Sequence, residues 1–296
     1  MSSGLRELRG RIRSIRRLRQ VTAALEKVAA VRLLSIRSME EMSRLYAERI
    51  GRLVSDVSSL VKTDSPLTRE PGPGVRYLVV FGSDSGMCGA FSSRLARASM
   101  GLVEDTLPNK TRALVVGRAT YGKALARGLS VEERFPEAAR GMEFKLAQTI
   151  RDRIMDGFVS GKYEEVTLVY NRLSSGTGQQ AATTRVLPVS PGEGDLVPRL
   201  PGQALWVDRA LWEPAPGQVL ARLLEDWVLA IIWRSLVSSM VCEYASRELT
   251  MHRATDNADR MTRELTRSYN RARQEQITTE ITEVMSGGSE RWQQDG

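Results

Sequence analysis

The chain has 296 residues, 42% of them hydrophobic and 6% aromatic, so it can form one large domain or two modest ones. Its net charge of +8 suits an anionic partner, whether nucleic acid, a membrane surface or an acidic protein. One histidine, His252, and two distant cysteines, Cys88 and Cys242, argue against a transition-metal site, a disulfide framework and a histidine-dependent triad. The sequence contains no run of about 18 apolar residues, so no membrane span is predicted. The N-terminus lacks the apolar core of a signal peptide.

All eleven prolines lie between Pro66 and Pro216. Because a proline inside a helix costs about 3 kcal/mol, the two proline-free ends permit long helices. We therefore expect an N-terminal helical segment at 1–62, a compact part at 74–190, a connector at 191–214, a C-terminal helical segment at 215–288 and a tail at 289–296.

The first helix is predicted from apolar residues that recur at helical spacing from Leu5 to about Val61. The stripe expected to face a partner helix begins with Leu5, Leu8, Ile12, Ile15, Leu18, Val21, Leu25 and Val28. Seven arginines also fall within the first nineteen residues, which suits either a phosphate-binding helix or a solvated, protein-facing surface. Leucine and isoleucine at core spacing between the arginines favour the second interpretation.

The last helix is predicted to begin near Pro216, since proline is harmless in a first turn, and to end at Gly287-Gly288. Its apolar residues step by three and four, the pattern of a coiled coil, and the small Ala254 and Ala258 allow a partner helix to approach closely. At about 1.5 Å per residue this helix outruns the first by roughly 20 Å. We expect another protein to surround the unpaired tip.

Between the two helices, short apolar runs alternate with helical patterns. The predicted strands are 76–81, 112–116, 166–170 and 184–189, and the predicted helices are 91–105, 119–127 and 141–159. Residues 171–180 are expected to form a polar loop. Strands that alternate with helices indicate a parallel sheet of Rossmann type.

A glycine-rich turn, 82–90, follows the first predicted strand. It contains neither G-x-G-x-x-G nor G-x-x-x-x-G-K-[ST], so we expect its glycines to allow a tight turn, with a nucleotide-dependent enzyme as the alternative. Cys88 in this turn is a potential nucleophile. However, His252 lies in the other long helix, with no acidic residue placed to orient it, so a small buried thiol is the preferred interpretation.

Five segments, in matching order, carry a resemblance to one family. They are Ile12 to Ile15 with Gln20 to Ala30, then Asp84 to Gly89, Ala254 to Ala258, Tyr269 to Gln274 and Ile277 to Gly287. This sequence resembles the gamma subunit of F-type ATP synthases from near residue 10 to residue 288. It departs from the family's pattern at Leu25 and Lys27, where methionines are usual, and at Ser85, where an arginine is usual.

The resemblance implies an α/β fold plus a coiled coil: a long antiparallel coiled coil of the N- and C-terminal helices with an inserted Rossmann-like α/β domain. It implies the central-stalk rotor subunit, which transmits torque between the membrane c-ring and the catalytic alpha/beta hexamer. The implied partners are the alpha, beta and epsilon subunits and the c-ring, with no nucleic acid and no cofactor. The chain would be non-catalytic and would associate peripherally with the cytoplasmic face of a bacterial inner membrane, through the complex alone.

The resemblance also implies two regions of contact with the beta subunit. Arg273, Gln274 and Thr278 match positions that touch a loop of beta in the family. Leu25, Lys27 and Arg32 match the region that faces the acidic lever segment of beta. Ordinary surface charge is the alternative interpretation for each of these residues.

Overall fold

The computed structural model describes residues 3–59, 61, 65–70, 72, 74–104, 111–138, 141–174, 178–190 and 213–292. It divides into two compact units: residues 1–29 together with 248–296, and residues 30–247. Most of the expected connector at 191–214 and the end of the expected tail lie outside the described residues. Each of the two long helices, α1 (Ser3–Ser58) and α5 (Pro216–Trp292), contributes to both units.

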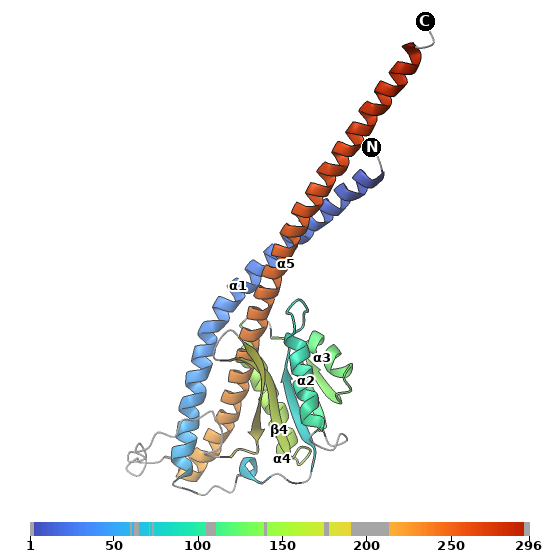
Figure 1. Cartoon of the computed structure of the whole chain (residues 1–296). Helices are drawn as coiled ribbons and strands as arrows, with labels where there is room; N and C mark the ends of the chain where they lie inside the picture. Colours follow the sequence, from blue (N-terminus) through green and yellow to red (C-terminus); the bar gives the residue numbers. More distant parts are fainter. Residues whose placement is uncertain are drawn as a thin grey trace. The chain divides into compact units, whose positions relative to one another are not determined.

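In the first unit, a segment of α1 runs beside a segment of α5 (Figure 1). Among the described residues, side-chain hydrogen bonds join them at Arg9–Tyr269, Arg19–Asp259, Thr22–Thr255 and Glu26–His252. Residue numbers rise along α1 as they fall along α5, so the two segments are antiparallel. A helix that buries one face against a neighbour gains most of its stability from that packing.

The face of α1 that packs in this unit differs from the predicted stripe. Leu5 and Ile12 are buried as expected, but Leu18, Val21 and Val28 are 56%, 55% and 64% exposed. Thr22 and Ala29 are buried instead. The predicted stripe was wrong at Leu18, Val21 and Val28, because α1 turns the adjacent face, with the smaller Thr22 and Ala29, towards the interior.

Helix α5 starts at Pro216, which confirms the predicted first turn. The prediction that it stops at Gly287-Gly288 was wrong, since the helix continues to Trp292. Each glycine costs a helix only about 1 kcal/mol relative to alanine, and no proline follows to block the next turn.

The second unit contains a five-stranded sheet in the order β3-β2-β1-β4-β5. The strands are β1 (Arg76–Phe81), β2 (Thr111–Val116), β3 (Val131–Phe135), β4 (Glu165–Leu173) and β5 (Gln179–Leu187). The first four strands are parallel, as the alternation of elements predicts, whereas β5 is antiparallel to β4.

Two features of this sheet were missed or misplaced by the sequence patterns. Strand β3 reads Val-Glu-Glu-Arg-Phe and pairs with β2 at one end of the strand order, so its charged residues can remain outside the core. The expected polar loop at 171–180 is shorter than predicted, because β4 continues to Leu173 and β5 begins at Gln179. Asn171 is polar, which suggested a loop, but it lies buried within β4.

Helices cover both faces of the sheet. The side chains of Leu78 and Val80 in β1 face the core formed with α2 (Phe91–Glu104) and α3 (Arg118–Leu125). Tyr77 and Val79 face the opposite core. That second core contains residues from α4 (Glu143–Val159), from the short 3₁₀ helix η1 (Pro66–Thr68) and from the second-unit parts of α1 and α5. Alternate residues of a strand point to opposite faces, which explains this division.

One 18-residue window in α5 has the length and mean hydropathy, 1.4, of a membrane span, although the sequence patterns predicted none. Within the structure 72% of that window is buried. Trp227 to Val241 contributes many of the core residues of the second unit, so the apolar stretch is accounted for by packing against the sheet.

Candidate protein-interaction site

The carboxyl ends of β1 and β4 mark the position where open parallel sheets commonly bind ligands. Here α5 occupies that position. The Ser239 hydroxyl donates to the carbonyl oxygen of Phe81, the last residue of β1, at 2.7 Å. The same hydroxyl oxygen accepts from the backbone N–H of Asn171 in β4 at 3.3 Å. The chain's own helix therefore fills the crevice between the two strands.

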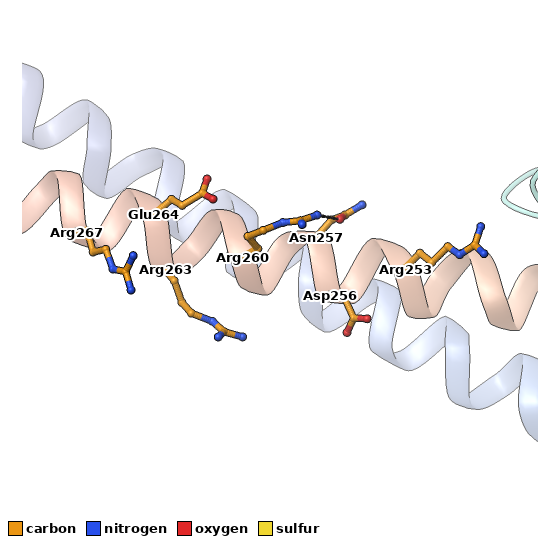
Figure 2. Close-up of a pocket in the computed structure, with 7 residues that line it drawn as sticks. All are labelled: Arg253, Asp256, Asn257, Arg260, Arg263, Glu264 and Arg267. Carbon is orange, nitrogen blue, oxygen red and sulfur yellow. Dashed lines mark hydrogen bonds between the residues drawn. The ribbon is translucent and has the colours of Figure 1, made fainter.

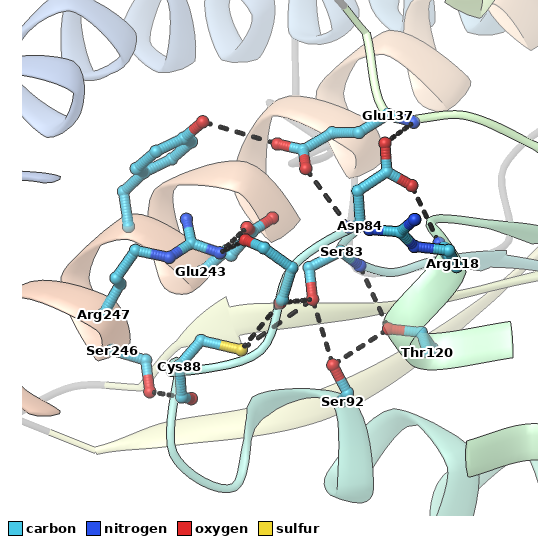
Figure 3. A network of polar contacts seen from close by, with 12 residues as sticks. Ser83, Asp84, Cys88, Ser92, Arg118, Thr120, Glu137, Glu243, Ser246 and Arg247 are labelled. Atoms are coloured by element: carbon cyan, nitrogen blue, oxygen red, sulfur yellow. Dashed lines mark hydrogen bonds and ion pairs between the residues drawn. The ribbon is translucent and has the colours of Figure 1, made fainter. Parts of the chain in front are cut away.

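The turn after β1 is also held by intramolecular contacts (Figure 3). One carboxylate oxygen of Asp84 accepts from the backbone N–H of Arg118, at the start of α3, at 2.8 Å. The other accepts from the backbone N–H of Glu137 at 3.1 Å. A helix N-terminus attracts anions, and in this protein the anion is Asp84.

Gly117 and Gly82 allow this close packing. A Cβ on Gly117 would lie 2.4 Å from the carbonyl carbon of Ser83, and the φ of Gly117 is +90°. A Cβ on Gly82 would lie 2.2 Å from the hydroxyl oxygen of Thr120. Within the predicted turn, 82–90, the contact at Gly82 and the φ of +59° at Gly89 confirm that glycine serves its geometry, whereas Gly117 follows β2.

Cys88 is a buried thiol, as predicted, and its sulfur lies 3.8 Å from the hydroxyl oxygen of Ser83. The prediction that no acid orients His252 was wrong. Nδ1 of His252 lies 2.9 Å from a carboxylate oxygen of Glu26, and Nε2 lies 3.5 Å from one of Asp256. The hydrogen bond to Glu26 and the charge of Asp256 raise the pKa of His252.

A basic groove of about 520 Å³ follows the α5 segment of the first unit (Figure 2). It is lined by Arg253, Asp256, Asn257, Arg260, Arg263, Glu264 and Arg267. Arg260 donates to Asn257. Arg253, Arg263 and Arg267 form no hydrogen bond or ion pair with any residue that the structure describes, so three exposed guanidinium groups remain available to an anionic partner.

The sequence patterns did not predict this row of arginines, although a signal was present. Arg253, Arg260 and Arg267 recur every seven residues, which places them on one side of a helix. The positive charge predicted at the N-terminal end is present on the surface of α1, where Arg6, Arg13, Arg16 and Arg17 are exposed.

The structure places the predicted beta-contact residues in different environments. Lys27, Arg273, Gln274 and Thr278 are exposed, and Leu25 is half-buried. Arg32, in the second unit, is only 13% exposed because it forms an ion pair with Glu143 at 2.6 Å.

Apolar side chains are also exposed near the C-terminal end of α5. Ile277, Ile281 and Met285 recur every four residues, so they lie on one face of the helix. A row of this kind is expected where another protein covers the helix.

These features define a class of protein before any relative is considered. At the carboxyl ends of β1 and β4 the chain's own helix contacts both strands. Within the described residues, α5 presents exposed arginines without a partner and a row of exposed apolar side chains. The chain is built to interact with other proteins through its helices.

Comparison with known proteins identifies the family. The sequence profile of the ATP synthase family matches residues 4–289. The ATP synthase gamma chain of Frankia casuarinae is 33% identical over 98% of this chain and 98% of its own length. The chain therefore belongs to the ATP synthase gamma chain family.

Solved structures share the fold. A chain of the Euglena gracilis mitochondrial ATP synthase rotor has a TM-score of 0.62 and 16% identity, covering 93% of this chain and 99% of its own. A chain in the OSCP/F1/c-ring structure from the same organism has a TM-score of 0.64 and 13% identity, with coverage of 97% and 94%.

Proposed function

We propose that this chain is the central-stalk rotor subunit of an F-type ATP synthase. It transmits torque between the membrane c-ring and the catalytic alpha/beta hexamer, and so couples ion translocation to ATP synthesis or hydrolysis. It is non-catalytic, because the reaction belongs to the beta subunits. The observation that carries the proposal is the antiparallel pairing of residues from the two ends of a chain that belongs to this family.

The proposed architecture follows from that pairing. The N-terminal helical segment, 1–62, and the C-terminal one, 215–288, wind into an antiparallel coiled coil, with a Rossmann-like domain at 74–190, a connector at 191–214 and a tail at 289–296. Torque requires helices that resist bending, and helices kink mainly at proline. Neither helical segment contains proline after its first turn.

The proposed partners are the alpha, beta and epsilon subunits and the c-ring, as in the rotor and F1/c-ring assemblies named for the structural relatives. The chain would reach the cytoplasmic face of a bacterial inner membrane through this complex alone. The exposed row of Ile277, Ile281 and Met285 would lie inside the alpha/beta hexamer, where it is shielded from water.

Contact with beta would use the exposed polar residues of α5, namely Arg273, Gln274 and Thr278. Exposed charged contacts contribute about 1 kcal/mol or less each, so they can break and re-form as the rotor turns. On α1, Leu25 and Lys27 would face the acidic lever of beta. Arg32 can join them only by exchanging its ion pair with Glu143 for one with the partner.

Assembly is the first test. The full chain is co-expressed with alpha and beta subunits, and the product is examined for a 3:3:1 complex with ATPase activity. Absence of such a complex rejects the proposal.

Rotation is the second test, because assembly alone does not demonstrate torque. Both native cysteines, Cys88 and Cys242, are buried, so an Arg127→Cys substitution provides a selective attachment point for a bead. We expect ATP to drive unidirectional rotation of the bead on immobilised complexes. An assembled, ATP-hydrolysing complex whose bead does not rotate contradicts the torque role.

A further inference from the structure

Glu243 is a buried acid that has no role in the proposed rotor function. Its side chain has no exposed surface, although it lies on α5 within the second unit. One carboxyl oxygen accepts a hydrogen bond from the Arg247 guanidinium at 2.6 Å. The other oxygen is buried without a hydrogen-bond partner among the described residues. A buried, half-satisfied carboxylate is costly unless it is neutralised.

Other acidic groups gather around Glu243 (Figure 3). Asp84 approaches from the turn after β1, and Glu137 from the segment after β3. Arg247 opposes these acids and also donates to the hydroxyl of Ser85 at 2.7 Å. The groups that face Glu243 and its neighbours from the packed elements are Asp84, Cys88, Glu137, Tyr244, Arg247 and, from α1, Arg32.

This balance favours a bound proton. Burial, followed by the nearby charge of Glu137, raises the pKa of Glu243 to about 8. Burial also raises the pKa of Glu137. Because Glu137 is itself an acid, it cannot neutralise a negative charge on Glu243. Two carboxyl groups that share a buried environment resist double ionisation.

The same residues form the joint between α5 and the turn after β1. Arg247 holds Ser85, and the Ser246 hydroxyl donates to the carbonyl oxygen of Cys88 at 2.7 Å. Tyr244 donates to Glu137 at 3.4 Å. A change in the charge of Glu243 therefore acts where the helix is attached to the sheet.

We propose that Glu243 binds a proton at the place where α5 is attached to the turn after β1. Loss of this proton at alkaline pH loosens the attachment. On ionisation, the unpaired oxygen becomes a second buried negative centre facing Glu137 and Asp84. Arg247 is then drawn towards Glu243 at the expense of Ser85, and water enters to solvate the charge. The inference concerns the second unit alone and does not depend on the rotor function.

The sign of the pH dependence is set by the raised pKa. The stability associated with protonated Glu243 is fully present below the ordinary glutamate pKa, near 4.5, and is lost as the pH rises through about 8.

The test compares Glu243→Gln, which keeps the shape and most of the hydrogen bonding without a charge, with native protein. Urea unfolding of the full chain is measured from pH 5 to 9.5. We expect the ratio of unfolding constants, native over variant, to rise by up to about tenfold per pH unit between about pH 5 and 8, and then to level off. Glu225, a partly exposed acid on the same helix, forms an ion pair with Arg222, so Glu225→Gln is the matched control and should give a flat ratio.

A second measurement needs no variant, and so decides the matter if Glu243→Gln fails to fold. The native chain is titrated by infrared spectroscopy, with hydrogen exchange of residues 82–90 followed in parallel and corrected for intrinsic rates. We expect a protonated-carboxyl band that persists at pH 7 and disappears near pH 8, with exchange of the turn rising over the same interval. Either a pH-independent unfolding ratio or the absence of the band at pH 7 overturns the proposal.

Discussion

Arg271 and Arg273 lie two residues apart on α5, but their surroundings differ. Arg271 forms an ion pair with Glu275 at 3.0 Å. Arg273 is exposed and forms no hydrogen bond or ion pair with the part of the chain that the structure describes. The charge of Arg271 is therefore paired within the helix, whereas that of Arg273 is available to a partner protein.

We predict that Arg273→Ala weakens binding of the chain to the alpha/beta hexamer by up to about fivefold, since an exposed charged contact contributes about 1 kcal/mol or less. Arg271→Ala, the matched control, should bind almost as tightly as the native chain. Affinity is measured by titrating labelled chain into the hexamer. Equal losses for both variants would mean that Arg273 makes no specific contact.

Gly117 provides a second residue-scale prediction. Gly117→Ala should lower the free energy of unfolding by about 2 kcal/mol or more, because its Cβ would meet the backbone of Ser83 at a positive φ. Gly122, inside α3, has open space around its Cα, so Gly122→Ala should stabilise the protein by about 0.5–1 kcal/mol. Urea denaturation of both variants checks the opposite signs.

At the scale of elements, the first unit shows that helical periodicity does not by itself decide which face is buried. Leu18 and Val21 are the bulkier residues, yet Thr22 is buried and its hydroxyl accepts from Thr255 at 2.8 Å. The exposed Leu18 and Val21 are then available for contact with other proteins.

The contact between Glu26 and His252 joins α1 to α5 in this unit and should depend on pH. Because the pKa of His252 is raised, its contribution to stability is fully present below the ordinary histidine pKa of about 6.5 and is lost as the pH rises through the raised value. Thermal unfolding should show His252→Gln less stable than the native chain at pH 5.5 and indistinguishable from it at pH 9. An effect of equal size at both values would assign the loss to packing.

At the scale of the whole molecule, the two units differ in how they are stabilised. The second unit has a sheet covered by helices on both faces, whereas the first consists of two helical segments joined by partly exposed contacts. Segments with few buried apolar contacts open at lower free energy than a packed core.

Limited trypsin digestion of the isolated chain should therefore cut first at the exposed arginines of the first unit, such as Arg260, Arg263 and Arg267. Residues 111–138 and 141–174 should survive longer. Assembly with alpha and beta subunits should suppress the early cleavage, because the helices are then covered. Mass spectrometry of the fragments over time tests the order, and early cuts within β2 or α4 would contradict it.

Several strands and helices could be predicted locally. Strand β1 matches its predicted bounds because a short apolar run ends at glycine, and the long helices follow from the distribution of proline. Strand β3 was missed because its five residues alternate between partly exposed and exposed, with three charges. Its pairing with β2 compensates for a weak local signal.

The candidate sites divide in the same way. The positions of Arg273, Gln274 and Thr278 came from resemblance to a family, whereas the free state of Arg273 and the engaged state of Arg32 required the structure. The closing of the sheet crevice by Ser239 could not be predicted, because Ser239 and Phe81 are separated by 158 residues.

The sequence by itself determined that two long helices, without proline beyond the first turn, flank an α/β region, and its motifs determined the family. Those properties depend on local backbone preferences and on short motifs. Only the tertiary structure decided that Thr22 is buried while Leu18 is exposed, that α5 fills the ligand crevice and that Glu243 lies among other acids. The physical reason is that burial and charge pairing depend on residues brought together from distant parts of the chain, which local periodicity does not encode.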